Sequence, residues 1–136
     1  DPGGLRGTHQ RIGRQITMAV TGKKVGRLDI RLVRGDTQRV GVRWRQRNVR
    51  TGQVGEVDVS QGWSARLVFQ SPDGQETWLS LPCGVMTADG LVACDITAAA
   101  FTPAMWSLRH TGRWKIVASH RAHQQTLAWG YWTLSE

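Results

Sequence analysis

The sequence predicts an all-β protein, an Ig-like antiparallel β-sandwich of about seven to eight strands, and three observations support this. Apolar and polar residues alternate along most of the chain, as they do in strands that bury one face. Turn sequences rich in glycine, aspartate and proline separate these short segments. Seven of the 136 residues are tryptophans, whose large apolar side chains suit the core of a small β protein.

The clearest predicted element is a β-hairpin within residues 62–81. The apolar positions of its first strand are Trp63, Ala65, Leu67 and Phe69. Residues 71–74, Ser-Pro-Asp-Gly, have the composition of a turn, and the alternation resumes over residues 76–81. Because a lone hairpin is only marginally stable in water, we expect a second sheet to cover its apolar face.

The other strands are expected on both sides of this hairpin. They cover residues 27–34, 38–47, 81–86, 91–96, 112–119 and 126–134. Polar residues 48–56 and 120–125 are predicted to be loops, and alanine-rich residues 97–106 to form a short helical turn between the sheets. In the last strand, Trp129 and Tyr131 point to one face and Trp132 to the other, so another segment or subunit should cover one of these faces.

We expect one β-sandwich domain, residues 27–136, preceded by an extended basic N-terminal arm, residues 1–26. The formal net charge is +8, and it is unevenly distributed. Residues 1–50 hold thirteen Lys and Arg against three Asp, whereas residues 51–100 hold one Arg against six acidic residues. A basic arm and a basic strand indicate an acidic partner, either protein or nucleic acid.

The candidate partner-binding residues are cations of the arm and of the second strand, together with two aromatic residues of the last strand. They are Arg6, Arg11, Arg14, Lys23, Lys24, Arg39, Arg43, Arg45, Arg47, Trp129 and Trp132. Arginine can bind carboxylates and phosphates through two parallel hydrogen bonds. In the alternative interpretation, the arginine strand is a solvated face whose charges protect an exposed edge against aggregation. The aromatic residues suit a protein interface or a platform on which a sugar stacks.

Enzymatic activity is not expected, because the chain carries none of the common motifs of serine hydrolases, zinc proteases or nucleotide-binding enzymes. Cys83 and Cys94 are separated by ten residues, too many for a paired zinc-ligand motif. We expect buried free thiols, with a cross-strand disulfide as the alternative, and neither a cofactor nor a metal. The sequence contains no apolar run that could span a membrane and no secretory leader, so no membrane partner is expected.

The order of the turn and tryptophan motifs resembles that of bacteriophage virion β-sandwich domains. The motifs are Gly-Asp-Thr at 35–37, Gly-Trp-Ser-Ala-Arg-Leu at 62–67, Pro-Asp-Gly at 72–74 and Gly-Arg-Trp at 112–114. Such domains occur at the N-terminus of upper baseplate proteins and as small long-tail-fibre or minor virion proteins. The resemblance covers residues 28–134, and it transfers no catalytic residue.

This resemblance implies a structural protein of the virion that is made in the host bacterial cytoplasm. It would dock in multiple copies, within a symmetric assembly, onto other tail, baseplate or head proteins, including as a capsid decoration. Two further functions stay open at this point. One is a nucleic-acid-binding domain that uses the same cations, and the other is a carbohydrate- or receptor-binding module that uses exposed tryptophans.

Overall fold

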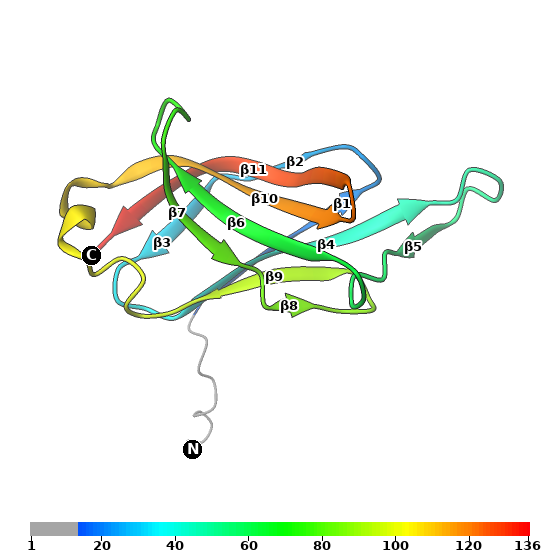
Figure 1. Cartoon of the computed structure of the whole chain (residues 1–136), viewed down its shortest axis with the longest axis horizontal. Coiled ribbons are helices and arrows are strands. Elements are labelled where there is room, and N and C mark those ends of the chain that lie inside the picture. Colours follow the sequence, from blue (N-terminus) through cyan, green and yellow to red (C-terminus); the bar gives the residue numbers. More distant parts are fainter. Residues whose placement is uncertain (1–13) are drawn as a thin grey trace, which may run out of the picture.

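A computed structural model describes residues 14–136, which form two β-sheets packed around one hydrophobic core (Figure 1). In the first, sheet A, the strand order is β1-β4-β9-β8, and β5 also pairs with β4. Its strands are β1 (Arg14–Thr21), β4 (Gln38–Arg47), β5 (Val54–Glu56), β8 (Val85–Met86) and β9 (Leu91–Ile96). The expectation of an all-β sandwich is confirmed.

The second sheet, sheet B, has the strand order β2-β11-β10-β6-β7, and β3 also pairs with β11. Its strands are β2 (Gly26–Arg27), β3 (Ile30–Val33), β6 (Ser64–Gln70), β7 (Thr77–Pro82), β10 (Thr111–His120) and β11 (His123–Ser135). A single-turn 3-10 helix, η1 (Ala104–Leu108), lies on the predicted crossing from sheet A to sheet B. Both sheets are mixed rather than purely antiparallel, because β1 runs parallel to β4 and β2 and β3 run parallel to β11.

The core lies between the inner faces of the two sheets. The predicted hairpin is confirmed, and Ala65, Leu67 and Phe69 on β6 are all buried. Trp132 on β11 packs edge-on against Phe69 at a centroid distance of 6.0 Å and lies 5.8 Å from Trp106 of η1. Burial of each large apolar side chain stabilises the fold by about 2–3 kcal/mol, so this aromatic cluster joins sheet B to the crossing segment.

Two glycine–tryptophan pairs make close packing possible within the β10–β11 hairpin. Gly112 of β10 lies opposite Trp132 of β11, and Trp114 of β10 lies opposite Gly130 of β11. The Trp114 indole N–H donates a 2.9 Å hydrogen bond to the carbonyl oxygen of Leu28, directly over Gly130. A Cβ on Gly130 would overlap that carbonyl, so this strand position requires glycine.

The predicted extent of the N-terminal arm is wrong, because residues 14–21 form β1 of sheet A. Along this strand Ile16, Met18 and Val20 are turned toward the core and alternate with exposed residues. The alternation is present in the sequence, but the partner strand that β1 pairs with is more than fifteen residues away and follows two other strands. Residues 1–13, with the candidate residues Arg6 and Arg11, lie outside the described residues.

Three other predicted segments differ from the structure. The expected loop 48–56 ends in β5, which pairs with β4 to form a projecting hairpin (Figure 1). The expected strand 81–86 is interrupted at Cys83 and Gly84, where the chain passes from sheet B to sheet A. The expected loop 120–125 is shorter, because His120 pairs with His123 and only two residues form the turn. Strands at the margins of the sheets contain many polar residues, so the sequence pattern does not distinguish them from loops.

Candidate interaction surfaces

The predicted arginine strand is β4, whose Arg39, Arg43 and Arg45 lie on the outer face of sheet A, away from the core. Arg39 forms an ion pair of 2.6 Å with Asp95 on the neighbouring strand β9. Arg43 forms an ion pair of 3.0 Å with Asp89. The hydrogen bond that the Arg39 guanidinium donates to Asp95 raises the pKa of Arg39. A hydrogen bond from Thr87, followed by that from Arg43, lowers the pKa of Asp89.

The other two arginines of this strand also have local neighbours. Arg45 lies opposite Glu56 in the register of the β4–β5 hairpin. The guanidinium of Arg47 donates a 2.7 Å hydrogen bond to the carbonyl oxygen of Gly52. The cations on the outer face of sheet A therefore have carboxylate or carbonyl neighbours within the same chain. Surface ion pairs of this kind contribute about 0.2–1 kcal/mol each to stability.

The outer face of sheet B has a different charge balance. Its outward-pointing cations are Arg27 on β2, Arg31 on β3, Arg66 on β6, and Arg113 and Lys115 on β10. Within the described residues, the strands of sheet B carry no acidic residue. Of the acids in the links, Asp29 pairs with Arg27 and Asp73 interacts with Arg113 through its charge, so cations outnumber acids on this face. We call this surface the cationic face. A positive electrostatic potential attracts acidic partners and accelerates their association.

Two aromatic residues lie at the centre of the cationic face. Trp129 and Tyr131 of β11 are in edge contact, with ring centroids 5.7 Å apart. The guanidinium of Arg27 stacks 4.6 Å from the Trp129 ring centroid and 5.2 Å from that of Tyr131. Arg113 lies 5.8 Å from the Tyr131 ring centroid, and the residue Tyr131 is 37% exposed. Trp, Tyr and Arg are the residue types that most often dominate binding energy at protein interfaces.

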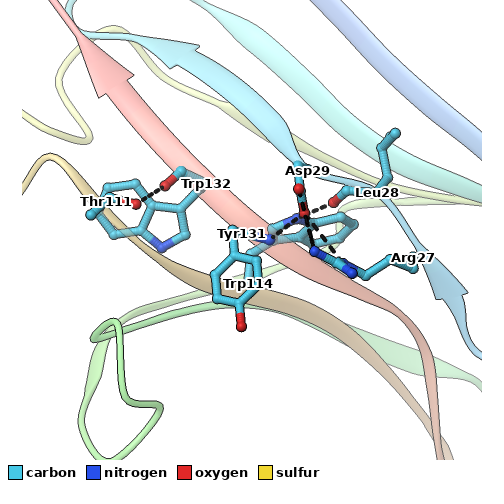
Figure 2. A network of polar contacts seen from close by, with 7 residues as sticks. All are labelled: Arg27, Leu28, Asp29, Thr111, Trp114, Tyr131 and Trp132. Atoms are coloured by element: carbon cyan, nitrogen blue, oxygen red, sulfur yellow. Dashed lines mark hydrogen bonds and ion pairs between the residues drawn. The ribbon is translucent and has the colours of Figure 1, made fainter.

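Asp29 fixes the position of Arg27 on this face (Figure 2). Its carboxylate accepts a 3.1 Å hydrogen bond from the backbone N–H of Tyr131 and forms a 3.0 Å ion pair with Arg27. The Tyr131 N–H, and then Arg27, lower the pKa of Asp29, which therefore stays ionised in mildly acidic solution. The carboxylate links the segment between β2 and β3 to β11, so the cationic face is ordered before any partner arrives.

The predicted site residues do not form one surface. Trp129 lies on the cationic face, but Trp132 is completely buried in the core, so its prediction as a partner-binding residue is wrong. The cause is the period of two, which directs neighbouring residues to opposite faces of a strand. Lys23 and Lys24 are exposed in the link between β1 and β2, and Arg14 is exposed at the start of β1.

Sequence reasoning missed most of the cationic face. The missed residues are Arg27, Arg31, Arg66, Arg113, Lys115 and Tyr131. One signal was present: Arg113 and Lys115 alternate with buried residues of β10 and pair with Tyr131 and Trp129 of β11. Pairing the last two predicted strands as a hairpin would have identified this part of the surface.

The two cysteines are buried free thiols, as predicted. Burial raises the pKa of Cys83 to about 12 and that of Cys94 to about 11, so both are protonated at neutral pH. Over residues 14–136, His, Cys, Asp and Glu do not gather into a group of three that could hold a metal ion. In the same range, no helix is long and apolar enough to cross a membrane.

No protein-family model matches this sequence, and no curated protein matches it. Among solved structures, the N-terminal domain of phage TP901-1 ORF48 is similar with a TM-score of 0.57, over 90% of this chain and 99% of that chain, at 7% identity. An uncharacterized protein from Bacillus anthracis str. Ames matches with a TM-score of 0.39 over 87% of this chain and 85% of that chain, at 11% identity. The protein therefore has the fold of a phage protein domain.

Proposed function

We propose that the protein is a structural, non-enzymatic component of a bacteriophage particle, and that it docks onto other particle proteins through the cationic face. The observation that carries this proposal is the excess of positive charge around Trp129 and Tyr131 on an ordered sheet surface. The fold that it shares with a phage protein domain supports its proposed place in a phage particle. The order of sequence motifs, which resembles that of upper baseplate proteins, favours a position in the tail or baseplate, in several symmetric copies.

In this mechanism, the partner presents carboxylates to the cations and apolar surface to the two aromatic rings. Arg113 and Lys115 steer the acidic partner toward the face, because charge complementarity acts mainly on the rate of association. Trp129 and Tyr131 then bury apolar area at a small cost in side-chain entropy. Asp29 holds Arg27 in place, so the guanidinium needs little reordering when the partner binds.

The proposal is tested by co-expressing the protein with the products of its flanking genes and measuring its copy number in purified particles. We expect the wild-type protein in particles, and a variant with Trp129→Ala and Tyr131→Ala reduced at least about tenfold, as loss of two central aromatic contacts predicts. The matched control is Met105→Ala with Leu108→Ala, since these apolar side chains are 63% and 87% exposed on η1. Absence of the wild-type protein from particles, or equal incorporation of both variants, contradicts the proposal.

A nucleic acid is the second candidate partner, because stacked aromatic and arginine side chains can also hold bases of a single strand. Phosphate contacts would make such binding fall steeply as salt rises. A gel-shift series with a single-stranded oligonucleotide separates the candidates. If binding persists at about 100 mM salt and requires Trp129 and Tyr131, the partner of the cationic face is a nucleic acid rather than a protein.

A further inference from the structure

A pocket of about 340 Å³ is lined by residues of the β1–β2 link, β4, the segment before β6 and the start of β11. In Figure 1, the β10–β11 turn and the β4–β5 hairpin lie at the same end of the sandwich. Its volume is at the lower end of the range for small-ligand sites. The side chains that matter for its chemistry are Lys23, Trp44, Gln46, Trp63, His123 and Gln125. These residues come from four separate segments of the chain, and they lie apart from Trp129 and Tyr131.

The apolar wall of the pocket consists of two tryptophans with fixed positions. The rings of Trp44 and Trp63 meet edge-on, with centroids 5.1 Å apart and an interplanar angle of 88°. The Trp44 indole N–H donates a 3.1 Å hydrogen bond to the carbonyl oxygen of Gly22, which satisfies its polar atom. The His120 ring lies against Trp63 at 5.0 Å and a tilt of 31°.

Gly62 makes the position of His120 possible. Its φ is +78°, and a Cβ at this residue would come within 2.9 Å of the imidazole nitrogen of His120. Both the backbone conformation and the space therefore favour glycine. Trp63 is consequently held between the core tryptophan Trp44 and His120, so its indole is positioned before a ligand binds.

Most polar side chains at the rim of the pocket make no hydrogen bond within the described residues. The Gln125 side-chain amide nitrogen donates a 2.9 Å hydrogen bond to Gly22, which orients the amide and leaves its oxygen to accept. The side chains of Lys23, Gln46 and His123 make no hydrogen bond or ion pair with other described residues. The rim thus presents two amides, one imidazole and one ammonium around an indole wall.

We propose that this pocket binds one hexopyranose unit of a glycan. A pyranose ring has an apolar face of C–H groups, which packs on an indole, and a perimeter of hydroxyls that both donate and accept hydrogen bonds. A wholly apolar ligand would leave the polar rim groups unsatisfied, and Lys23 repels a cationic ligand. The proposal does not depend on the phage assignment or on the cationic face.

The test is titration of the full chain with glucose, galactose and N-acetylglucosamine, each to about 50 mM, with binding followed by saturation-transfer NMR and by tryptophan fluorescence. We expect saturable binding of at least one sugar, with a Kd on the order of 1 mM, as one shallow site predicts. Gln46→Ala and His123→Ala should each weaken that binding about fivefold without a change in melting temperature, because both side chains are exposed. The control Gln75→Ala, an exposed amide outside this pocket, should bind as the wild type does.

Trp63→Ala should reduce sugar binding more than either rim variant, but it also removes packing against Trp44, so its melting curve is recorded in parallel. The proposal is overturned if none of the three sugars binds, or if the rim variants bind as tightly as the wild type. Loss of particle incorporation in the Trp129 and Tyr131 variant has no bearing on this outcome, because these residues do not line the pocket.

Discussion

The outer faces of the two sheets both carry several arginines, but the contacts of these arginines differ. On sheet A, Arg39 and Arg43 reach carboxylates of their own chain at 2.6 and 3.0 Å. On sheet B, Arg31 and Lys115 are directed outward, and among residues 14–136 no carboxylate pairs with them. Arg27 pairs with Asp29 but also stacks on Trp129.

This difference shows that the number of cations on a strand does not identify a binding surface. A guanidinium that already holds a carboxylate must break that pair before it can bind a partner, so its net gain from docking is small. A guanidinium or ammonium that faces only water gives up less on docking. We therefore expect the arginines of sheet A to affect stability, and the cations of sheet B to affect association.

The largest expected effect lies beneath the cationic face. Gly130→Ala should lower the free energy of unfolding by about 3 kcal/mol, because the added Cβ overlaps the Leu28 carbonyl and displaces its hydrogen bond to Trp114. Urea denaturation measures this change. The control is Gly55→Ala, since a Cβ there meets no atom within 4 Å. A loss of equal size in both variants would mean that the glycine–tryptophan pair is not what stabilises this hairpin.

The next effect concerns sheet A. Arg39→Ala combined with Arg43→Ala should cost about 1 kcal/mol of unfolding free energy, because two surface ion pairs are lost. Raising the salt concentration should reduce the difference from the wild type, since salt screens exposed charges. If this double variant were as stable as the wild type at low salt, the arginines of sheet A would not differ from those of sheet B in their effect on stability.

Asp29→Asn should have a smaller and pH-dependent effect. The Asp29 pKa is lowered from its ordinary value of 3.8 in the folded chain, so its contribution is present above that pH and is lost as the pH falls through the lower folded value. The variant should therefore be less stable than the wild type at pH 7, and the two should converge as the pH falls below 3.8 and through the lower folded pKa. Acid denaturation measures this difference. If the stability difference between the variant and the wild type did not change with pH, the Asp29 carboxylate would not hold Arg27 in place.

The smallest effect on stability is expected on sheet B. Arg31→Ala combined with Lys115→Ala should change the free energy of unfolding by less than about 0.5 kcal/mol, because neither side chain has an ion-pair partner within the described residues. Thermal denaturation at low salt measures this. A loss as large as that of the sheet A double variant would show that these cations are also structural.

The sequence predicted the sandwich well because its central strands alternate strictly. Ala65, Leu67 and Phe69 of β6 point inward, as their alternation with polar residues predicts. The opposite directions of Trp129 and Trp132 also follow from the period of two. Local patterns of this kind need no knowledge of which strands are neighbours.

The pairing of charges could not be predicted in the same way. Whether Arg39 faces an acid depends on the register of β4 against β9, which joins residues 56 positions apart. The parallel position of β1 beside β4 likewise has no local signal. The Gly-x-Trp sequences at 112–114 and 130–132 did contain a register signal, since antiparallel pairing sets each glycine opposite the other tryptophan.

The most direct test of the central claim compares two variants that each lose two cations. Arg39→Ala with Arg43→Ala changes sheet A, and Arg31→Ala with Lys115→Ala changes the cationic face. Copy number in purified particles is measured for both against the wild type. We predict unchanged incorporation of the first variant and a loss of about five- to tenfold for the second. Reduced incorporation of the first variant together with normal incorporation of the second would contradict it.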